Sequence, residues 1–143
     1  GLARLAFEKR PAPTRLHDEA AESLRELVRH LKGGGVMAVL LDPYTKRGAP
    51  VDFLGHPAPS GTAIAELALK YRLPMIPVYG TRQPDGLSVA VEFEAPIPPG
   101  TALEMTQAAA DSLAARVRAT PGQYYWLHRR WVKSFDAGTG SSP

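Results

Sequence analysis

The spacing of apolar residues predicts three amphipathic helices. The first follows residue 16 and ends at the glycines 33–35, and its apolar stripe consists of Leu24, Leu27, Val28 and Leu31. The second stops before Pro74, and its stripe consists of Ile64, Leu67, Ala68 and Tyr71. The third begins at Thr101, which forms a capping-box pattern with Glu104, and extends to about Ala119.

Three segments have the character of strands. Residues 36–41 are an uninterrupted apolar run, typical of a strand buried on both faces of a parallel sheet. Residues 75–79 predict a second short strand, in which Pro77 indicates a sheet edge, a bulge or a special backbone site. Residues 87–93 alternate between apolar and polar and follow the turn sequence 83–86. Residues 42–61, rich in proline and glycine, are expected to form a loop.

This order predicts an α/β fold in which a right-handed crossover joins residues 36–41 and 75–79 as parallel strands. Three strands make a thin sheet for this much helix, so we expect an incomplete portion of a larger domain. We divide the chain into an N-terminal arm or linker (1–16), one domain portion (17–135) and a flexible Gly/Ser-rich tail (136–143).

Composition restricts the chemistry. The chain of 143 residues has no cysteine, which excludes disulfides, thiolate metal ligands and a cysteine nucleophile. Its four histidines lack ligand spacing and no phosphate or dinucleotide motif is present, so we expect no metal and no cofactor. A net charge of +3 is compatible with an anionic partner or with none. No apolar run approaches the roughly 20 residues of a membrane-spanning helix, and no signal peptide is evident.

A histidine and a glutamate near the start form a His-x4-Glu pattern, His17 and Glu22. In one interpretation the histidine is a general base oriented by the carboxylate. In the other, which we favour, both residues belong to the charged, solvent-facing start of the first helix and take no part in catalysis.

Two polar residues follow predicted strands, where α/β proteins bind ligands. Asp42 follows the first strand and is either a ligand contact or the cap of a turn. Arg82 follows the second and either binds phosphate or lies on the surface beside a hairpin. In the loop between them, Phe53, Gly55 and His56 either form a site that allows close backbone approach or belong to a proline-stiffened connection.

Residues 124–131 combine four large aromatic side chains with His128, Arg129 and Arg130. This composition suits a membrane interface, where Trp and Tyr lie at headgroup level and Arg binds phosphates. It also suits stacking on nucleic-acid bases, or a closing helix whose aromatics fill the core. Such a helix would direct the two arginines away from its aromatic side.

Taken in order, these blocks resemble the late acyltransferases of lipid A biosynthesis, the lauroyl or myristoyl acyltransferases. The similarity covers about residues 22–133, and its most specific part is the sequence Gln-Tyr-Tyr-Trp-Leu-His-Arg-Arg-Trp at 123–131. The other matching blocks are residues 36–42, 51–58, 65–70 and 74–79, with Arg82. The resemblance implies that this chain is the C-terminal half of such an enzyme.

The resemblance further implies a glycerol-phosphate-acyltransferase-like mixed sheet flanked by helices. It implies transfer of a fatty acyl chain from acyl carrier protein to a hydroxyl of a phosphorylated lipid A precursor, at the anionic cytoplasmic face of the bacterial inner membrane. The substrate-binding residues expected on this basis are Asp42, Phe53, Gly55, Arg82, His128, Arg129 and Arg130.

This sequence departs from the family at two points. Pro43 follows Asp42 where the family usually has Gln, and only 41 residues precede Asp42. The family's His-x4-Asp/Glu dyad should therefore lie outside the chain, leaving the catalytic residues unknown and the chain inactive alone. The alternative is a non-catalytic module that binds anionic lipid or a carrier protein. A nucleic-acid binder is disfavoured, because basic residues are spread along the chain.

Overall fold

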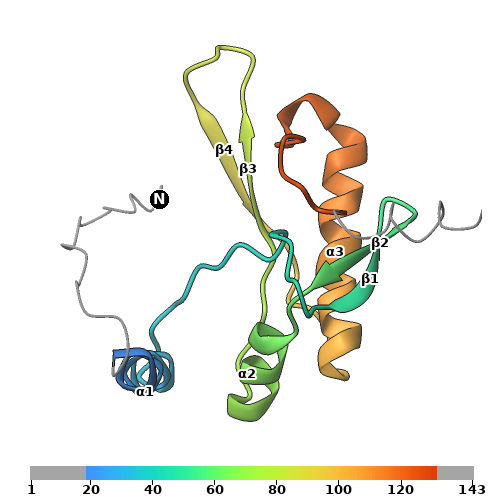
Figure 1. The fold of residues 1–143 in the computed structure, drawn as a ribbon. Helices are drawn as coiled ribbons and strands as arrows, with labels where there is room; N and C mark the ends of the chain where they lie inside the picture. The colour runs from blue at the N-terminus through green and yellow to red at the C-terminus, as the bar shows by residue number, and fades with distance from the viewer. Residues whose placement is uncertain (1–18, 132–143) are drawn as a thin grey trace, which may run out of the picture. The chain divides into compact units, whose positions relative to one another are not determined.

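A computed structural model describes residues 19–131, with side chains described from residue 25 onward. Along this stretch the elements are α1 (Glu19–Lys32), β1 (Ala49–Phe53), β2 (His56–Ser60), α2 (Ala63–Tyr71), β3 (Val78–Arg82), β4 (Val89–Phe93), α3 (Ala102–Ala119) and the short 3-10 helix η1 (Pro121–Gln123) (Figure 1). The chain divides into two compact units, Gly1–Met37 and Ala38–Pro143. The predicted arm 1–16 and tail 136–143 lie outside the described residues.

The three predicted helices are confirmed. In the first unit, α1 ends at Lys32, and the N–H of Gly33 donates to the carbonyls of Arg29 and His30. Gly34 has a φ of 85°, the left-handed backbone that ends many helices. In the second unit, α2 ends at Tyr71, before Pro74 as expected.

The third helix, α3, has the capping box that its sequence predicts. The Thr101 hydroxyl accepts from the Glu104 N–H at 3.2 Å, and the Glu104 carboxylate accepts from the Thr101 N–H at 2.7 Å. These two bonds satisfy backbone donors that the first helical turn leaves without partners.

The strands form two antiparallel hairpins, β1–β2 and β3–β4, so the fold is mixed α/β with two small sheets. The predicted parallel crossover is wrong. Residues 36–41 are not a strand, and Val36 and Leu40 are 87% and 80% exposed. The strand predicted at 75–79 is confirmed only in part, since β3 (Val78–Arg82) shares its last two residues, and the strand predicted at 87–93 is confirmed as β4 (Val89–Phe93).

The expectation of an irregular loop over residues 42–61 is also wrong, because β1 and β2 lie within it. Proline is tolerated in these strands at positions whose N–H would point away from the partner strand. Pro50 pairs with Pro59, and Asp52 pairs with Pro57. All four residues are at positions whose backbone nitrogen points away from the partner strand. The N–H of Asp52 does point outward, since it donates to the Gln107 side chain at 2.8 Å. The prolines therefore remove no ladder bond.

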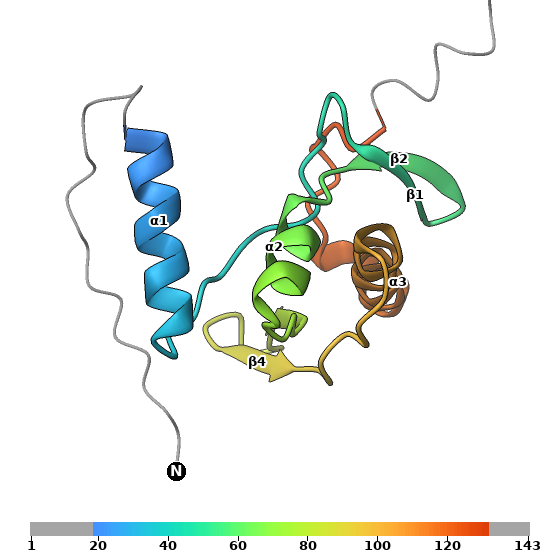
Figure 2. The ribbon, with the colours of Figure 1, turned by 90° about the horizontal axis from the view of Figure 1, so that it is seen from below.

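Two apolar clusters hold the second unit together around α3. One joins β1–β2 to the C-terminal half of α3 and contains Val51, Phe53, Ala58, Ala110, Ala114 and Val117. The other joins α2 to the N-terminal half of α3 and contains Ala65, Ala68, Met75 and Met105. Figure 2, seen nearly along α3, shows β1–β2 and α2 on different sides of this helix. In the part of the chain that the structure describes, no helix is long and apolar enough to cross a membrane.

Candidate functional site

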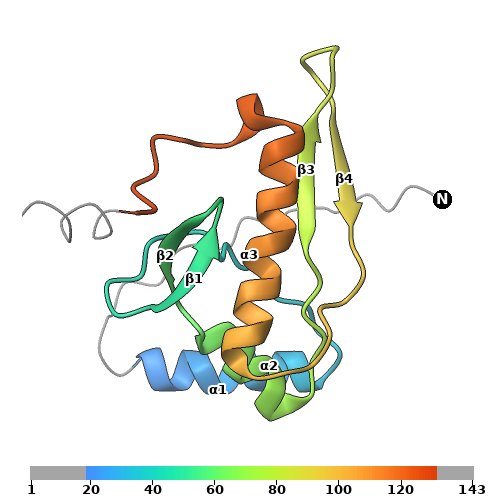
Figure 3. The same cartoon turned by 90° about the vertical axis from the view of Figure 1, so that its right-hand side faces the viewer.

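Residues 121–131, here called the closing segment, leave the end of α3 and run back to the β1–β2 hairpin (Figure 3). After η1 the segment consists of successive turns, so the closing helix considered for 124–131 is wrong. Backbone hydrogen bonds between residues two apart in the sequence fix these turns: the Trp126 N–H donates to the Tyr124 carbonyl, and the Arg130 N–H donates to the His128 carbonyl. The direction of each side chain therefore depends on these turns and does not follow the 3.6-residue period of a helix.

Three side chains of the closing segment converge on Asp42. The Tyr124 hydroxyl donates to the Asp42 carboxylate at 3.4 Å. His128 Nε2 donates to the Asp42 main-chain carbonyl at 2.9 Å, and Arg130 Nη1 donates to the same oxygen. Burial, reinforced by the Asp42 charge, raises the pKa of Tyr124, so its hydroxyl stays protonated at neutral pH. The predicted residues Asp42, His128 and Arg130 are thus brought together.

Arg130 is buried, which corrects the idea that it faces a membrane beside Arg129. Its side chain is 2% exposed, whereas Arg129 is exposed. Arg130 Nη2 donates to Ser60 Oγ at 3.2 Å, and the guanidinium carbon lies 4.8 Å from the centre of the Phe53 ring. Burial lowers the pKa of Arg130, but an arginine remains charged at neutral pH. The second unit therefore contains a buried positive charge at Arg130.

Phe53 supports this arrangement from the core. It is 0% exposed, and its ring lies 5.7 Å from that of Trp131 and 5.9 Å from that of Tyr124. In this structure Phe53 has no surface available to a substrate. Gly55 occupies the β1–β2 turn, where Leu54 and Gly55 have φ values of 57° and 87°. Two positive φ values are those of a type I′ hairpin turn, and Gly is the residue that adopts them readily.

Arg82 is tied to the closing segment through Gln123. The Gln123 side chain accepts from the Arg82 N–H at 2.7 Å and donates to the Arg82 carbonyl at 3.1 Å. The Arg82 side chain is exposed and donates to the Gly86 carbonyl at 3.1 Å. The structure does not bring Arg82 into the group around Asp42. Sequence reasoning missed the linking role of Gln123, and nothing in the local pattern indicates it.

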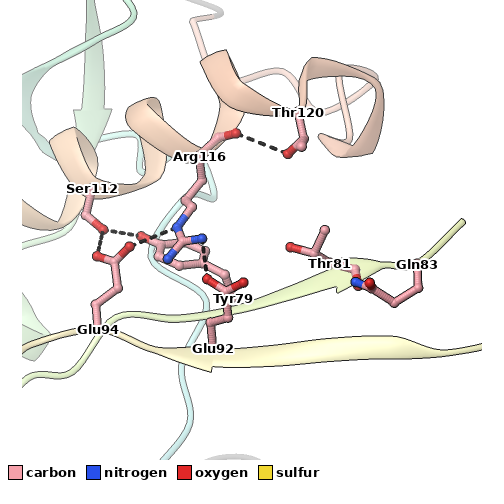
Figure 4. A network of polar contacts seen from close by, with 8 residues as sticks. All are labelled: Tyr79, Thr81, Gln83, Glu92, Glu94, Ser112, Arg116 and Thr120. Atoms are coloured by element: carbon pink, nitrogen blue, oxygen red, sulfur yellow. Dashed lines mark hydrogen bonds and ion pairs between the residues drawn. The ribbon is translucent and has the colours of Figure 1, made fainter.

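A separate polar network joins the β3–β4 hairpin to α3 (Figure 4). Arg116 pairs with Glu92 at 2.5 Å and with Glu94 at 2.9 Å. The Ser112 hydroxyl donates to Glu94 at 2.5 Å and lies 2.7 Å from the Tyr79 hydroxyl. The Ser112 bond and then Arg116 lower the pKa of Glu94 against the opposing effect of burial. Both carboxylates are therefore committed to Arg116.

The cavity that adjoins this group is small. Its volume is about 20 Å³. It is lined by Arg130 together with Leu41, Ser60, Thr106, Ala109, Ala110 and Leu113. This volume has room for about one water molecule and is far too small for an acyl chain. No cluster of histidines and carboxylates able to bind a metal occurs within residues 25–131.

Comparison with known proteins identifies the family. A family model described as bacterial lipid A biosynthesis acyltransferase matches residues 4–133. The chain belongs to this family. The match includes both hairpins, α3 and the closing segment, so the group around Asp42 is part of an acyltransferase of lipid A biosynthesis. No curated protein matches the chain.

A histidine held by a carboxylate is the general base that the resemblance implies. His128 is committed to a main-chain carbonyl, and His30 lies 3.3 Å from the Val36 carbonyl. Among residues 25–131, no histidine hydrogen bonds a carboxylate. His17 and the side chain of Glu22 lie outside the described residues, so the interpretation of that pair stays a prediction.

Proposed function

We propose that this chain takes part in transferring a fatty acyl chain, of the lauroyl or myristoyl type, from acyl carrier protein to a hydroxyl of a phosphorylated lipid A precursor. The reaction takes place at the cytoplasmic face of the bacterial inner membrane, within a complete domain of the glycerol-phosphate-acyltransferase type. The family match supports acyl transfer in lipid A biosynthesis. The donor, the acceptor, the location and the complete domain are our proposal.

The observation that carries this proposal is the convergence of the closing segment on Asp42. The Asp42 carboxylate accepts from the Tyr124 hydroxyl and keeps further lone pairs, so it can also accept a hydrogen bond from a sugar hydroxyl. The exposed arginines Arg82 and Arg129 are suited to the phosphates of the precursor, because a guanidinium binds phosphate through two parallel hydrogen bonds. Phe53 and Gly55 shape the hairpin that supports the group.

An anionic membrane surface is the proposed setting of the site. Tyr125, Trp126 and Leu127 are 68%, 50% and 82% exposed, and Arg129 follows them. Aromatic side chains next to an arginine are typical of the headgroup region of a bilayer. This surface is distinct from the buried position of Arg130.

A non-catalytic module that binds anionic lipid or acyl carrier protein is the second candidate. It is favoured by the lack of a histidine–carboxylate pair among residues 25–131. We propose that the His-x4-Asp/Glu dyad lies outside these 143 residues and that His17 is not the base. Substituting His17→Ala should then leave the turnover of the complete enzyme within a few-fold of wild type, whereas loss of a general base lowers it by roughly 10²–10⁴-fold.

The decisive experiment supplies the complete enzyme with lauroyl or myristoyl acyl carrier protein and a phosphorylated lipid A precursor, and detects the acylated product by mass spectrometry. We expect acylation by wild type and a large but measurable decrease in turnover in an Asp42→Ala variant of unchanged melting temperature. Binding of the carrier protein or of anionic vesicles without any acylation would instead identify the non-catalytic module.

A further inference from the structure

The proposed function gives no role to the buried guanidinium of Arg130. It is the largest fully buried side chain among the described residues, at 2% exposure. Its hydrogen-bond partners are a main-chain carbonyl and the Ser60 hydroxyl, and its Nε has none within residues 25–131. Burying a charge without a bonded carboxylate is costly, and apolar residues of similar volume are often as stable or more so. Stability alone therefore gives no reason for an arginine at this position.

The main-chain carbonyl of Asp42, to which Arg130 donates, gives a reason for an arginine at position 130. Residues 35–48 contain no strand, so no sheet ladder fixes the main chain at Asp42. Two side chains of the closing segment do so instead, from positions 86 and 88 residues away, and both bond the Asp42 carbonyl. A planar guanidinium suits this task because it can reach the carbonyl and Ser60 Oγ together, which anchors residue 42 to the end of β2.

We propose that Arg130 is a positioning residue, which holds the main chain at residue 42 so that the Asp42 carboxylate stays beside the Tyr124 hydroxyl. This inference rests on the proposed function, in which that carboxylate binds the acceptor hydroxyl. Arg130 does not bind the phosphates of the precursor, because its guanidinium is buried and the adjoining cavity of about 20 Å³ cannot admit them. Arg130 affects substrate binding only through the position of Asp42.

The first test needs no substrate. Arg130→Met has similar volume without the charge and the donors, and Arg130→Lys keeps the charge but cannot reach both acceptors at once. We expect either variant to melt near the wild-type temperature while amide hydrogen exchange accelerates in residues 38–48 and stays unchanged in α3. The matched control is Arg118→Met, on the exposed side of α3, which should leave exchange unchanged in both regions. If Arg130→Met does not fold, Arg130→Lys decides the result.

The second test measures acyl transfer by the complete enzyme. Misplacing a reacting or binding group by about 1 Å lowers turnover on the order of 10²-fold, so kcat/KM should fall by that order in Arg130→Met and partly recover in Arg130→Lys. The double variant Asp42→Ala with Arg130→Met should be no less active than Asp42→Ala alone, because Arg130 acts through Asp42.

The outcomes separate this inference from the proposed function. A wild-type enzyme that transfers no acyl group refutes the proposed function, while the exchange data still decide whether Arg130 holds residue 42. Unchanged exchange in residues 38–48 of both folded variants overturns the positioning role. Additive losses in the double variant overturn it as well, since they show that Arg130 acts independently of the Asp42 carboxylate.

Discussion

The arginines of this chain show how strongly surroundings determine what one residue type does. Arg116 pairs with two carboxylates at the surface, Arg129 is exposed, and Arg130 is buried against Phe53. Sequence reasoning grouped Arg129 with Arg130 because they are adjacent and flanked by aromatic residues. It could not separate them, because the direction of each side chain depends on turns whose hydrogen bonds leave no pattern in the sequence.

At the residue scale, Phe53 should be among the most important side chains for stability. It is 0% exposed and contacts Tyr124, Arg130 and Trp131. Phe53→Ala should lower the free energy of unfolding by about 3–5 kcal/mol, through lost burial and the cavity that remains. The control is Phe93→Ala, at a ring that is 67% exposed, which should change it by less than about 1 kcal/mol. Urea denaturation of both variants measures the difference, and equal losses would contradict the core position of Phe53.

Glu94 should make stability depend on pH. The pKa of its carboxyl is lowered, first by the Ser112 hydroxyl and then by Arg116, so the folded state favours the charged form. Its contribution is complete above the unfolded pKa of about 4.3 and is lost as pH falls through the lower folded pKa. Glu94→Gln should therefore destabilise the protein at pH 7 and reduce the further loss between pH 7 and pH 3. Ser112→Ala should reproduce part of this effect. Urea denaturation at pH 7, 5 and 3 tests it, and an acid-induced loss as large as in wild type would count against the network.

At the scale of elements, the helices could be predicted and the sheets only in part. Helix signals are local: an apolar stripe, a capping box and a terminating proline lie within a few residues of each other. The pairing of strands is not local. Residues 36–41 have the composition of a buried strand but no partner strand, whereas the proline-rich residues 49–60 form a hairpin because their prolines fall at outward-facing positions.

Thr62 and Thr101, the N-cap residues of α2 and α3, offer a matched test of capping. Thr101 caps α3 through its side chain, whereas the Thr62 side chain makes no capping bond in α2 and donates to Glu66 instead. Thr101→Ala should lower the free energy of unfolding by about 1 kcal/mol, and Thr62→Ala by clearly less. Chemical denaturation at neutral pH measures both. Equal effects would show that the capping box adds nothing beyond a surface hydrogen bond.

At the scale of the whole molecule, the closing segment connects parts of the chain that are distant in sequence. Gln123 bonds Arg82 at the end of β3, while Tyr124, His128 and Arg130 bond Asp42. The resemblance at residues 123–131 therefore marked the segment that organises the candidate site. The individual roles could not be predicted, because two of the predicted site residues, Phe53 and Arg130, act from the interior and retain no surface that a ligand can reach.

The exposed side of the closing segment leads to a prediction for the membrane. If Tyr125, Trp126 and Arg129 contact an anionic bilayer, Arg129→Gln should weaken binding to phosphatidylglycerol-containing vesicles by about 1 kcal/mol, roughly fivefold. Raising the salt concentration should reduce this difference, because screening shortens the range of the attraction. Arg118→Gln removes the same charge from the exposed side of α3 and should have a smaller effect. Vesicle sedimentation at low and high salt gives the comparison. Equal weakening by both variants would show that net charge alone attracts the protein, and an unchanged affinity in Arg129→Gln would exclude this surface from membrane contact.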